Sequence, residues 1–199
     1  VPLYDSQVAW LANQNMNYLV GGEVPGRMGT GHPNLVPYQV FATADGNLML
    51  AVGNDRQFAD CVACIGEPEL AADRRYSRNR ARVANRETLV GLLQTAFAKQ
   101  PTGYWLAELR ERGVPAGPVN DIREVLENDY AKERQLVHFV ENSTGDKVPT
   151  VANPVDFALT PVRYSSAPPT LGEHTDEVLQ EWLGYSDESI AELRDNSVI

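Results

Sequence analysis

The chain has 199 residues, of which 43% are hydrophobic and 22% charged, a balance that excludes collagen-like, low-complexity and disordered classes. Seventeen basic against 27 acidic side chains give a formal net charge of −10, which repels a phosphate backbone, so we expect no nucleic-acid partner. The sequence also lacks the run of roughly 18 apolar residues that a membrane-spanning helix needs, so we expect no membrane partner.

The first elements are a helix and a loop. The segment from Asp5 to Val20 predicts one amphipathic helix, because Val8, Leu11 and Leu19 follow helical spacing. From Gly21 to Pro37 the chain holds five glycines and three prolines, a density that no regular element tolerates. We therefore expect a long loop there, and long loops in compact proteins are often functional.

A hairpin and three helices are predicted next. Two strand-like runs, 38–43 and 48–52, flank the turn signal Asp45-Gly46. Helices are expected over 55–64, capped by Asn54 or Asp55, over 86–99, and from Thr102, as the cap, to a stop at Gly113. This region therefore predicts a small unit of one hairpin and several helices.

The rest of the chain predicts shorter elements. Residues 114–120, which contain Pro115 and Pro118, read as a rigid extended connection at a boundary and not as a core strand. We then expect short helices at 121–128 and 130–136, a hairpin of 138–141 with 147–151, an extended linker at 161–170, and helices at 173–183 and 187–194, the last capped by Ser186.

Two cysteines, Cys61 and Cys64, are too few for the disulfide framework of a small secreted domain, so a reducing, cytoplasmic compartment is expected. Their spacing equals half a zinc site, but no second pair completes four ligands, so we expect no metal and interpret both as buried packing residues. The residues from Val1 to Asp5 match no signal peptide and lack an initiator Met, so we read the chain as part of a longer polypeptide and leave targeting upstream of Val1 open.

The loop from Arg27 to Asn34 is the most suggestive stretch for chemistry. Glycines allow backbone N–H groups to approach a phosphate, a carboxylate or an oxyanion closely. The loop matches neither a dinucleotide-binding fingerprint nor a P-loop, and a plain surface loop is the alternative reading. His32 has a pKa suited to acid–base work, with a hydrogen-bonding spacer as its alternative.

Six arginines between positions 74 and 86 form a local positive cluster in an acidic chain. Such a cluster is able to receive an anionic ligand such as a phosphorylated cofactor. The competing interpretation is that these side chains pair with nearby carboxylates and cap helix ends. They are Arg74, Arg75, Arg78, Arg80, Arg82 and Arg86.

Taken together, an ordered set of motifs resembles the class III CoA-transferase family over nearly the whole chain, and corresponds to about the C-terminal half of a family member. The motifs are Pro25-Gly-Arg-Met-Gly-Thr-Gly-His-Pro33, Gly53-Asn-Asp55, Asn79-x-x-Arg82-Val-x-Asn-Arg86, Gly113-Val-Pro-Ala-Gly-Pro-Val119, Asn153-Pro154 and Ala167-Pro-Pro-x-Leu-Gly-Glu-His-Thr175. The family includes formyl-CoA:oxalate, carnitine and dicarboxylyl CoA-transferases and 2-methylacyl-CoA racemases.

The resemblance implies an α/β fold in which this chain is an α+β fragment. Residues 1–28 would be a helix and linker of a Rossmann-like large domain that is mostly absent. Residues 29–112 would be a small domain carrying the glycine-rich active-site loop. Residues 113–199 would be a connection and a C-terminal segment returning to the large domain. Family members form interlocked homodimers, so a homodimer is expected.

The resemblance also implies an activity: transfer of CoA between carboxylic acids through a covalent aspartyl intermediate. The aspartate lies upstream of this chain, so no catalytic residue is assigned here, and the chain alone is expected to be inactive. Acyl-CoA and a small carboxylic acid would be the substrates, with CoA a substrate and no covalently bound cofactor. The substrate-binding residues implied are Arg27, Gly29, Thr30, Gly31, His32 and Asn34.

Three functions remain open at this point. The His32-Pro33 pair resembles the transferase branch of the family, and the context Val36-Pro37-Tyr38-Gln39 is similar to members acting on dicarboxylic acids. A 2-methylacyl-CoA racemase or isomerase is the alternative within the family. A binding or interaction fragment without catalysis is the alternative outside it.

Overall fold

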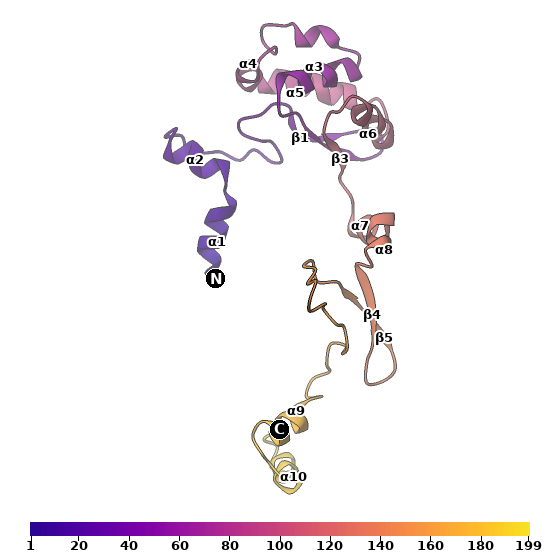
Figure 1. Cartoon of the computed structure of the whole chain (residues 1–199). Coiled ribbons are helices and arrows are strands. Elements are labelled where there is room, and N and C mark those ends of the chain that lie inside the picture. Colours follow the sequence, from indigo (N-terminus) through magenta and orange to yellow (C-terminus); the bar gives the residue numbers. More distant parts are fainter. The chain divides into compact units, whose positions relative to one another are not determined.

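The computed structural model describes residues 1–199, which form ten α-helices, one 3₁₀-helix and five β-strands in two compact units, Val1–Val119 and Asn120–Ile199 (Figure 1). The mixed helix-and-strand class expected from the sequence is confirmed, with small antiparallel sheets in both units. No helix is long and apolar enough to cross a membrane.

A three-stranded antiparallel sheet lies at the centre of the first unit, in the order β1 (Tyr38–Ala42), β2 (Asn47–Ala51), β3 (Ala116–Pro118). The predicted hairpin is confirmed, with Tyr38 opposite Ala51 and Ala42 opposite Asn47. β-Branched and aromatic side chains in the first run and the Asp45-Gly46 turn signal were sufficient to specify it.

The extended connection expected at residues 114–120 ends at the boundary between the two units, but it also contains a strand, β3, that the prediction did not include. Ala116 pairs with Leu50 and Pro118 with Leu48, so this segment adds an edge strand to the sheet. The two residues that flank β3 also bond β2. Ala51 N donates to Pro115 O, and Val119 N donates to Asn47 O. The alternation of an antiparallel ladder then directs position 118 away from β2, so the missing N–H of proline costs no ladder bond.

The helices between β2 and β3 gather on one side of this sheet (Figure 1). They are α3 (Asp55–Cys64), η1 (Pro68–Ala71), α4 (Asn79–Ala84), α5 (Arg86–Phe97) and α6 (Thr102–Glu111). The predicted helices over 55–64 and 86–99 are confirmed, and Asn54 caps α3 by accepting from Gln57 N. The core between sheet and helices consists of apolar side chains that include Phe41, Leu48, Leu50, Phe58, Leu89, Leu93, Phe97, Trp105 and Leu109.

The N-terminus of α6 is capped by a residue from outside the helix. We expected Thr102 to be its cap, but Thr102 is the first helical residue and Pro101 precedes it. Asp45, in the hairpin turn, accepts from Thr102 N at 2.7 Å and thereby satisfies a free helix donor. This hydrogen bond holds the pKa of the Asp45 carboxyl below its ordinary value. Gly113 ends the helix with φ +68°, as expected.

The single N-terminal helix predicted over 5–20 is divided into α1 (Leu3–Trp10) and α2 (Asn13–Leu19). Ala12 interrupts it with φ 44°, and Asn15 Nδ2 donates to Val8 O at 2.7 Å, a side-chain bond that competes with helix geometry. Neither helix has a buried residue, and large apolar side chains such as Leu3, Trp10 and Leu19 are exposed.

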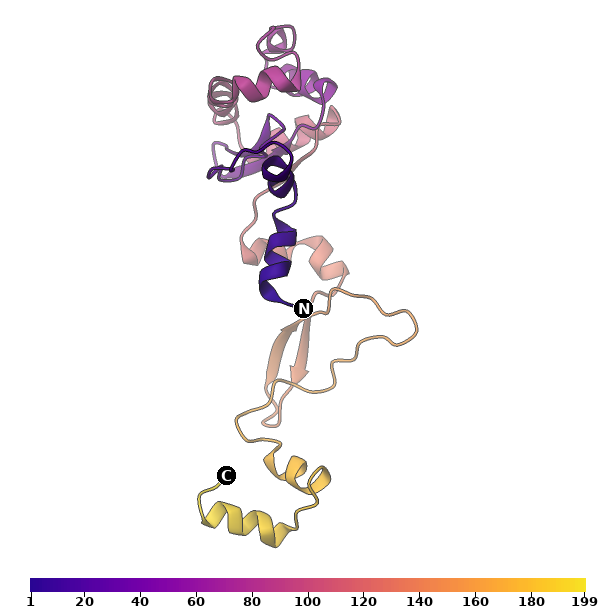
Figure 2. The same ribbon diagram turned by 90° about the vertical axis from the view of Figure 1, so that its left-hand side faces the viewer.

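The second unit contains the short elements that the sequence predicted. They are α7 (Ile122–Glu127), α8 (Asp129–Glu133), β4 (Val137–Glu141), β5 (Lys147–Val151), α9 (Thr175–Glu181) and α10 (Asp187–Asp195). Strands β4 and β5 form a separate antiparallel hairpin, seen as adjacent arrows in Figure 2. Ser186 caps α10 as predicted, and residues 161–170 contain no regular element.

The two cysteines lie in α3, where Cys61 is buried and Cys64 is half-buried. Burial raises the pKa of both thiols, which disfavours a reactive thiolate. No three His, Cys, Asp or Glu side chains come together as metal ligands.

Candidate functional site

The glycine-rich segment turns sharply at residues 28–31. Gly31 N donates to Met28 O at 3.0 Å, which closes a β-turn. Gly29 occupies the second position of that turn with φ +58°, while Thr30 keeps a negative φ, the pattern of a type II′ turn. Glycine is the residue that adopts this backbone conformation without strain, so the turn explains the choice at Gly29.

After the turn, the segment runs along the free edge of β1. Val40 N donates to Thr30 Oγ1 at 3.1 Å, and His32 N donates to Tyr38 O at 2.9 Å. Further along the same edge, the side-chain amide of Gln94 bonds both N and O of Ala42. Four outward backbone groups of the edge strand, Tyr38 O, Val40 N and both groups of Ala42, are therefore satisfied by the loop and by α5, which fixes the loop against the sheet.

His32 is half-buried and stacks on Tyr38 with ring centroids 5.2 Å apart. Its Nδ1 accepts from Asn34 N at 3.0 Å, and its Nε2 lies 2.8 Å from the side-chain amide nitrogen of Asn13 in α2. Desolvation and the nearby positive charge of Arg86 lower the pKa of the imidazole. His32 is consequently neutral at physiological pH and holds the loop in shape.

Arg86, the first residue of α5, lies against the loop backbone. Its Nη2 donates to His32 O at 2.8 Å and to Pro33 O at 2.7 Å. Its Nη1 is buried and has no hydrogen-bond partner. A Cβ placed on Gly31 would lie 3.6 Å from that nitrogen and 3.2 Å from Met28 O, so glycine allows the loop to pass close to the guanidinium.

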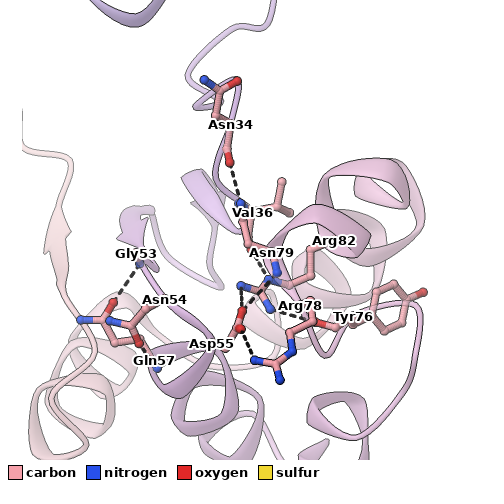
Figure 3. A network of polar contacts seen from close by, with 10 residues as sticks. All are labelled: Asn34, Val36, Gly53, Asn54, Asp55, Gln57, Tyr76, Arg78, Asn79 and Arg82. Carbon is pink, nitrogen blue, oxygen red and sulfur yellow. Dashed lines mark hydrogen bonds and ion pairs between the residues drawn. The ribbon is translucent and has the colours of Figure 1, made fainter.

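Helix α4 holds the end of the loop through Asn79 and Arg82 (Figure 3). Asn79 Nδ2 donates to Asn34 O at 2.7 Å, and Val36 N donates to Asn79 Oδ1 at 3.2 Å. Arg82 Nε donates to Val36 O at 2.6 Å. Because Val36 is fully buried, this end of the loop is tied to the core of the first unit.

Arg82 is itself buried, with 1% of its side chain exposed, and each of its three side-chain nitrogens donates a hydrogen bond. Its Nη1 donates to Tyr76 O and its Nη2 to Asp55 Oδ1, while its guanidinium lies over the Phe58 ring at 4.4 Å. A buried charge is tolerated only with partners of this kind. Arg82 therefore links the loop to the start of α3.

Asp55, at the start of α3, collects the other ends of these contacts (Figure 3). Besides Arg82, it accepts from Arg78 Nη1 at 3.2 Å and from Asn79 N at 3.1 Å. Partial desolvation raises the pKa of the Asp55 carboxyl, but the hydrogen bonds from Arg82 and Arg78, the charge of Arg82 and the Asn79 N–H outweigh it, so the pKa is lowered.

A cavity of about 710 Å³ borders the loop. Asn17 of α2 and Asn34 of the loop lie on its wall, and Asn34 Nδ2 donates to Asn17 Oδ1 at 3.0 Å. The remaining lining includes Met28 and Pro33 on the loop side and Val83 on α4. The loop thus forms one wall of a concave site of the size that small ligands occupy.

The structure brings together most of the residues that the sequence singled out. Thr30, Gly31, His32 and Asn34 belong to one bonded segment, Gly29 forms its turn, and Arg27 is exposed and stands outside this network. Sequence reasoning did not assign a role to the side chains that hold the segment from other elements, although four of them, Asp55, Asn79, Arg82 and Arg86, belong to the quoted motifs. The full set is Asn13, Asn17, Asp55, Asn79, Arg82 and Arg86.

The arginine cluster follows its carboxylate-pairing interpretation at three positions. Arg75 pairs with Asp73 at 2.7 Å, and Arg78 and Arg82 pair with Asp55. Arg86 does something that neither reading included, since it bonds backbone carbonyls of the loop. Asn79 and Arg82 are three residues apart and share one face of α4, so their spacing was an available signal, whereas Arg86 opens the next helix, α5.

Comparison with known proteins agrees with this architecture. The chain matches the family model described as CoA-transferase family III over residues 1–175. It is 42% identical over 179 residues to a succinate–glutarate CoA-transferase of Agrobacterium fabrum, a match that covers 90% of this chain and 45% of that protein. It is 36% identical over 197 residues to the human succinyl-CoA:glutarate CoA-transferase, a match that covers 99% of this chain and 45% of that protein.

A solved structure has the same fold over the matched region. The crystal structure of a CAIB/BAIF family protein from Brucella suis has a TM-score of 0.73 and 39% sequence identity, covering 90% of this chain and 46% of that one. The chain thus spans about half the length of the proteins it matches. The resemblance stated from its motifs is confirmed, and the chain belongs to CoA-transferase family III.

Proposed function

We propose that this chain is part of a CoA-transferase that moves CoA from succinyl-CoA to a second dicarboxylic acid of similar size, such as glutarate. Two relatives that cover nine-tenths or more of the chain are named for transfer between succinate and glutarate. In such a reaction succinyl-CoA and glutarate give succinate and glutaryl-CoA, so one thioester is broken and one is formed, and no outside energy source is needed.

The observation that carries the proposal is the glycine segment 28–34, which is held against β1 and Arg86 and whose ends, at Met28 and at Pro33 and Asn34, line a cavity. Transfer of an acyl group passes through oxyanions, which need preorganised donors, and a narrow backbone without side chains lets an acyl thioester lie close by. We assign substrate contacts to Gly29, Thr30, Gly31, His32 and Asn34. We also assign a substrate contact to Arg27, which lies at the exposed side of the loop.

For the chemistry we propose an aspartate nucleophile located outside these 199 residues. Its carboxylate attacks the acyl carbonyl and releases CoA thiolate, leaving a mixed anhydride. The thiolate then attacks the aspartyl carbonyl and releases the first carboxylic acid, leaving an aspartyl-CoA thioester. The acceptor carboxylate reverses these two steps. Dividing one acyl transfer in this way lowers each barrier, and each tetrahedral oxyanion requires donors.

We also propose that the enzyme works as a homodimer. The apolar side chains along α1 and α2, among them Leu3, Trp10 and Leu19, are exposed on this chain. Exposed apolar surface of this kind marks interaction sites, which supports an assembly that covers these helices.

The assay uses the purified full-length protein with succinyl-CoA and glutarate, and product CoA esters are separated by liquid chromatography and identified by mass. Formation of glutaryl-CoA that depends on both substrates supports the proposal. Deuterium entering the 2-position of an acyl-CoA without any acceptor acid would instead show a racemase or isomerase. Binding of acyl-CoA without either reaction would show a binding protein and reject the transferase.

A further inference from the structure

Three side chains from α4 and the start of α5 hold successive parts of the segment 32–36. Arg86 bonds the carbonyls of His32 and Pro33. Asn79 bonds the carbonyl of Asn34 and the N–H of Val36, and Arg82 bonds the carbonyl of Val36. We call this set, Asn79, Arg82 and Arg86, the loop clamp.

The members of the loop clamp differ in what they hold. Asn79 and Arg82 bond the end of the segment at the buried Val36, and Arg82 is itself locked by Asp55 (Figure 3). Their contacts are those of a core-forming network. Arg86 bonds the half-buried residues next to the glycine turn, where the proposed substrate contacts lie.

The hydrogen bonding of Arg86 does not fit a purely stabilising role. Its Nη1 is buried without a partner beside Gly31, and an unpaired buried donor lowers the free energy of unfolding. No carboxylate is paired with it, whereas Arg75, Arg78 and Arg82 all have one. What Arg86 provides is a rigid planar group that brings one nitrogen to two carbonyls and sets the path of the loop.

We propose that Arg86 is a positioning residue for CoA transfer: through the carbonyls of His32 and Pro33 it fixes where the glycine turn lies relative to the reacting acyl group, without touching the substrate. This inference rests on the proposed function. Asn79 and Arg82 secure the far end of the segment, so loss of Arg86 releases the turn while the rest of the unit stays folded.

The test compares Arg86→Ala, Arg86→Lys and the control Arg80→Ala in the full-length protein. Arg80 is an exposed residue of α4, the helix that carries Asn79 and Arg82, and stands outside the clamp. Because small displacements of positioned groups cost up to about 100-fold in rate, we expect Arg86→Ala to lower kcat about 10- to 100-fold and to change the KM for succinyl-CoA less than about threefold. Arg86→Lys keeps the positive charge but loses the planar guanidinium, so its kcat should lie between those of the wild type and Arg86→Ala.

Rescue and hydrogen exchange separate positioning from stability. Guanidinium ion at non-denaturing concentration should restore part of the kcat of Arg86→Ala, and ammonium should not. Amide exchange should become faster in residues 28–36 of this variant and stay unchanged in β2, which bonds only the neighbouring strands of the sheet. Unchanged kcat, unchanged exchange in 28–36, or loss of protection across the whole unit would each overturn the proposal.

The same experiment distinguishes failure of the positioning role from failure of the proposed function. If the wild-type protein transfers no CoA between dicarboxylic acids, the proposed function fails, and the exchange measurement still decides whether Arg86 holds the loop. If the wild type transfers CoA and Arg86→Ala transfers it at the same rate, the proposed function stands and the positioning role is rejected.

Discussion

Arg82 and Asp55 form an ion pair in which the two partners differ in exposure: 1% of the arginine side chain is accessible, against 36% of the aspartate, and Nη2 lies 2.9 Å from Oδ1. The buried guanidinium also bonds two backbone carbonyls, one of them at the end of the glycine segment. The pair therefore connects the stability of the first unit to the position of the proposed active-site loop.

Replacing Asp55 with Asn should destabilise the protein, because it leaves the buried charge of Arg82 without its counter-charge. Hydrogen bonds to charged groups are worth about 1.5–3 kcal/mol, and partial exposure of Asp55 places the expected loss at about 1.5–2 kcal/mol. Urea unfolding followed by tryptophan fluorescence measures it.

The matched control is Asp60→Asn in the same helix α3, where the partner Arg56 is 3.9 Å away and 93% exposed. Exposed pairs contribute about 0–1 kcal/mol, so this variant should unfold at nearly the wild-type urea concentration. Equal losses for the two aspartate variants would show that the buried arginine does not depend on Asp55.

The pKa of His32 should be below its ordinary value of 6.5, because desolvation and the charge of Arg86 disfavour the imidazolium. Because its pKa is lower in the folded protein, His32 binds fewer protons there than in the unfolded chain. Its contribution to the free energy of unfolding is therefore complete above pH 6.5 and is lost as the pH falls toward the lowered value. NMR titration of the imidazole measures the pKa directly, and Arg86→Gln should raise it. A pKa that does not change in this variant contradicts the proximity of the two groups.

Gly31→Ala should slow CoA transfer. The new Cβ would lie 3.2 Å from Met28 O and 3.6 Å from Arg86 Nη1, so the turn has to shift. We expect kcat to fall about tenfold or more, since displacement of a positioned group by about 1 Å has effects up to 100-fold.

Gly91→Ala serves as the control, because a Cβ there meets nothing within 4 Å and the residue lies in the exposed face of α5. This change should leave kcat unaltered and stabilise the helix by about 0.5–1 kcal/mol. If both alanine variants turn over at the wild-type rate, the close packing at Gly31 has no part in catalysis.

Gln94→Leu should destabilise the edge of the sheet. The amide of Gln94 bonds both N and O of Ala42, and a leucine leaves those groups of β1 unpaired. Two neutral hydrogen bonds contribute about 1–3 kcal/mol together, which chemical denaturation would resolve. Gln100→Leu, at an exposed position, is the comparison, and a similar loss there would indicate an effect of the added leucine alone.

Local signals were enough to predict much of the fold. The Asp45-Gly46 turn between two apolar runs specified β1 and β2, and cap residues such as Asn54 and Ser186 marked helix starts. These elements depend on neighbouring residues in the sequence, where turn and cap preferences act.

Two features that the sequence did not predict depend on distant partners. β3 exists because β2 offers a free edge to a proline-containing segment, and the cap of α6 comes from Asp45, 57 positions away. The break at Ala12 places Asn13 and Asn17 of α2 against His32 and Asn34. Tertiary contacts decided the first two cases, whereas the break at Ala12 is accompanied by the local bond from Asn15 to Val8 O.

The glycines were enough to locate the candidate site in the sequence, but the side chains that hold the loop could not be identified from it. Gly29 and Gly31 are recognisable from sequence because few other residues fit a tight turn and a close approach. Asn79, Arg82 and Arg86 bond the loop from 43 to 54 positions away, and only the fold reveals which carbonyls they meet.

Hydrogen exchange of residues 28–34, measured in the full-length protein with and without succinyl-CoA, tests whether this segment covers the acyl group. If this segment covers the acyl group, its amides exchange more slowly when succinyl-CoA is bound. Exchange in 28–34 that stays the same while other segments gain protection from the bound thioester would show that the substrate lies elsewhere, and would contradict the account.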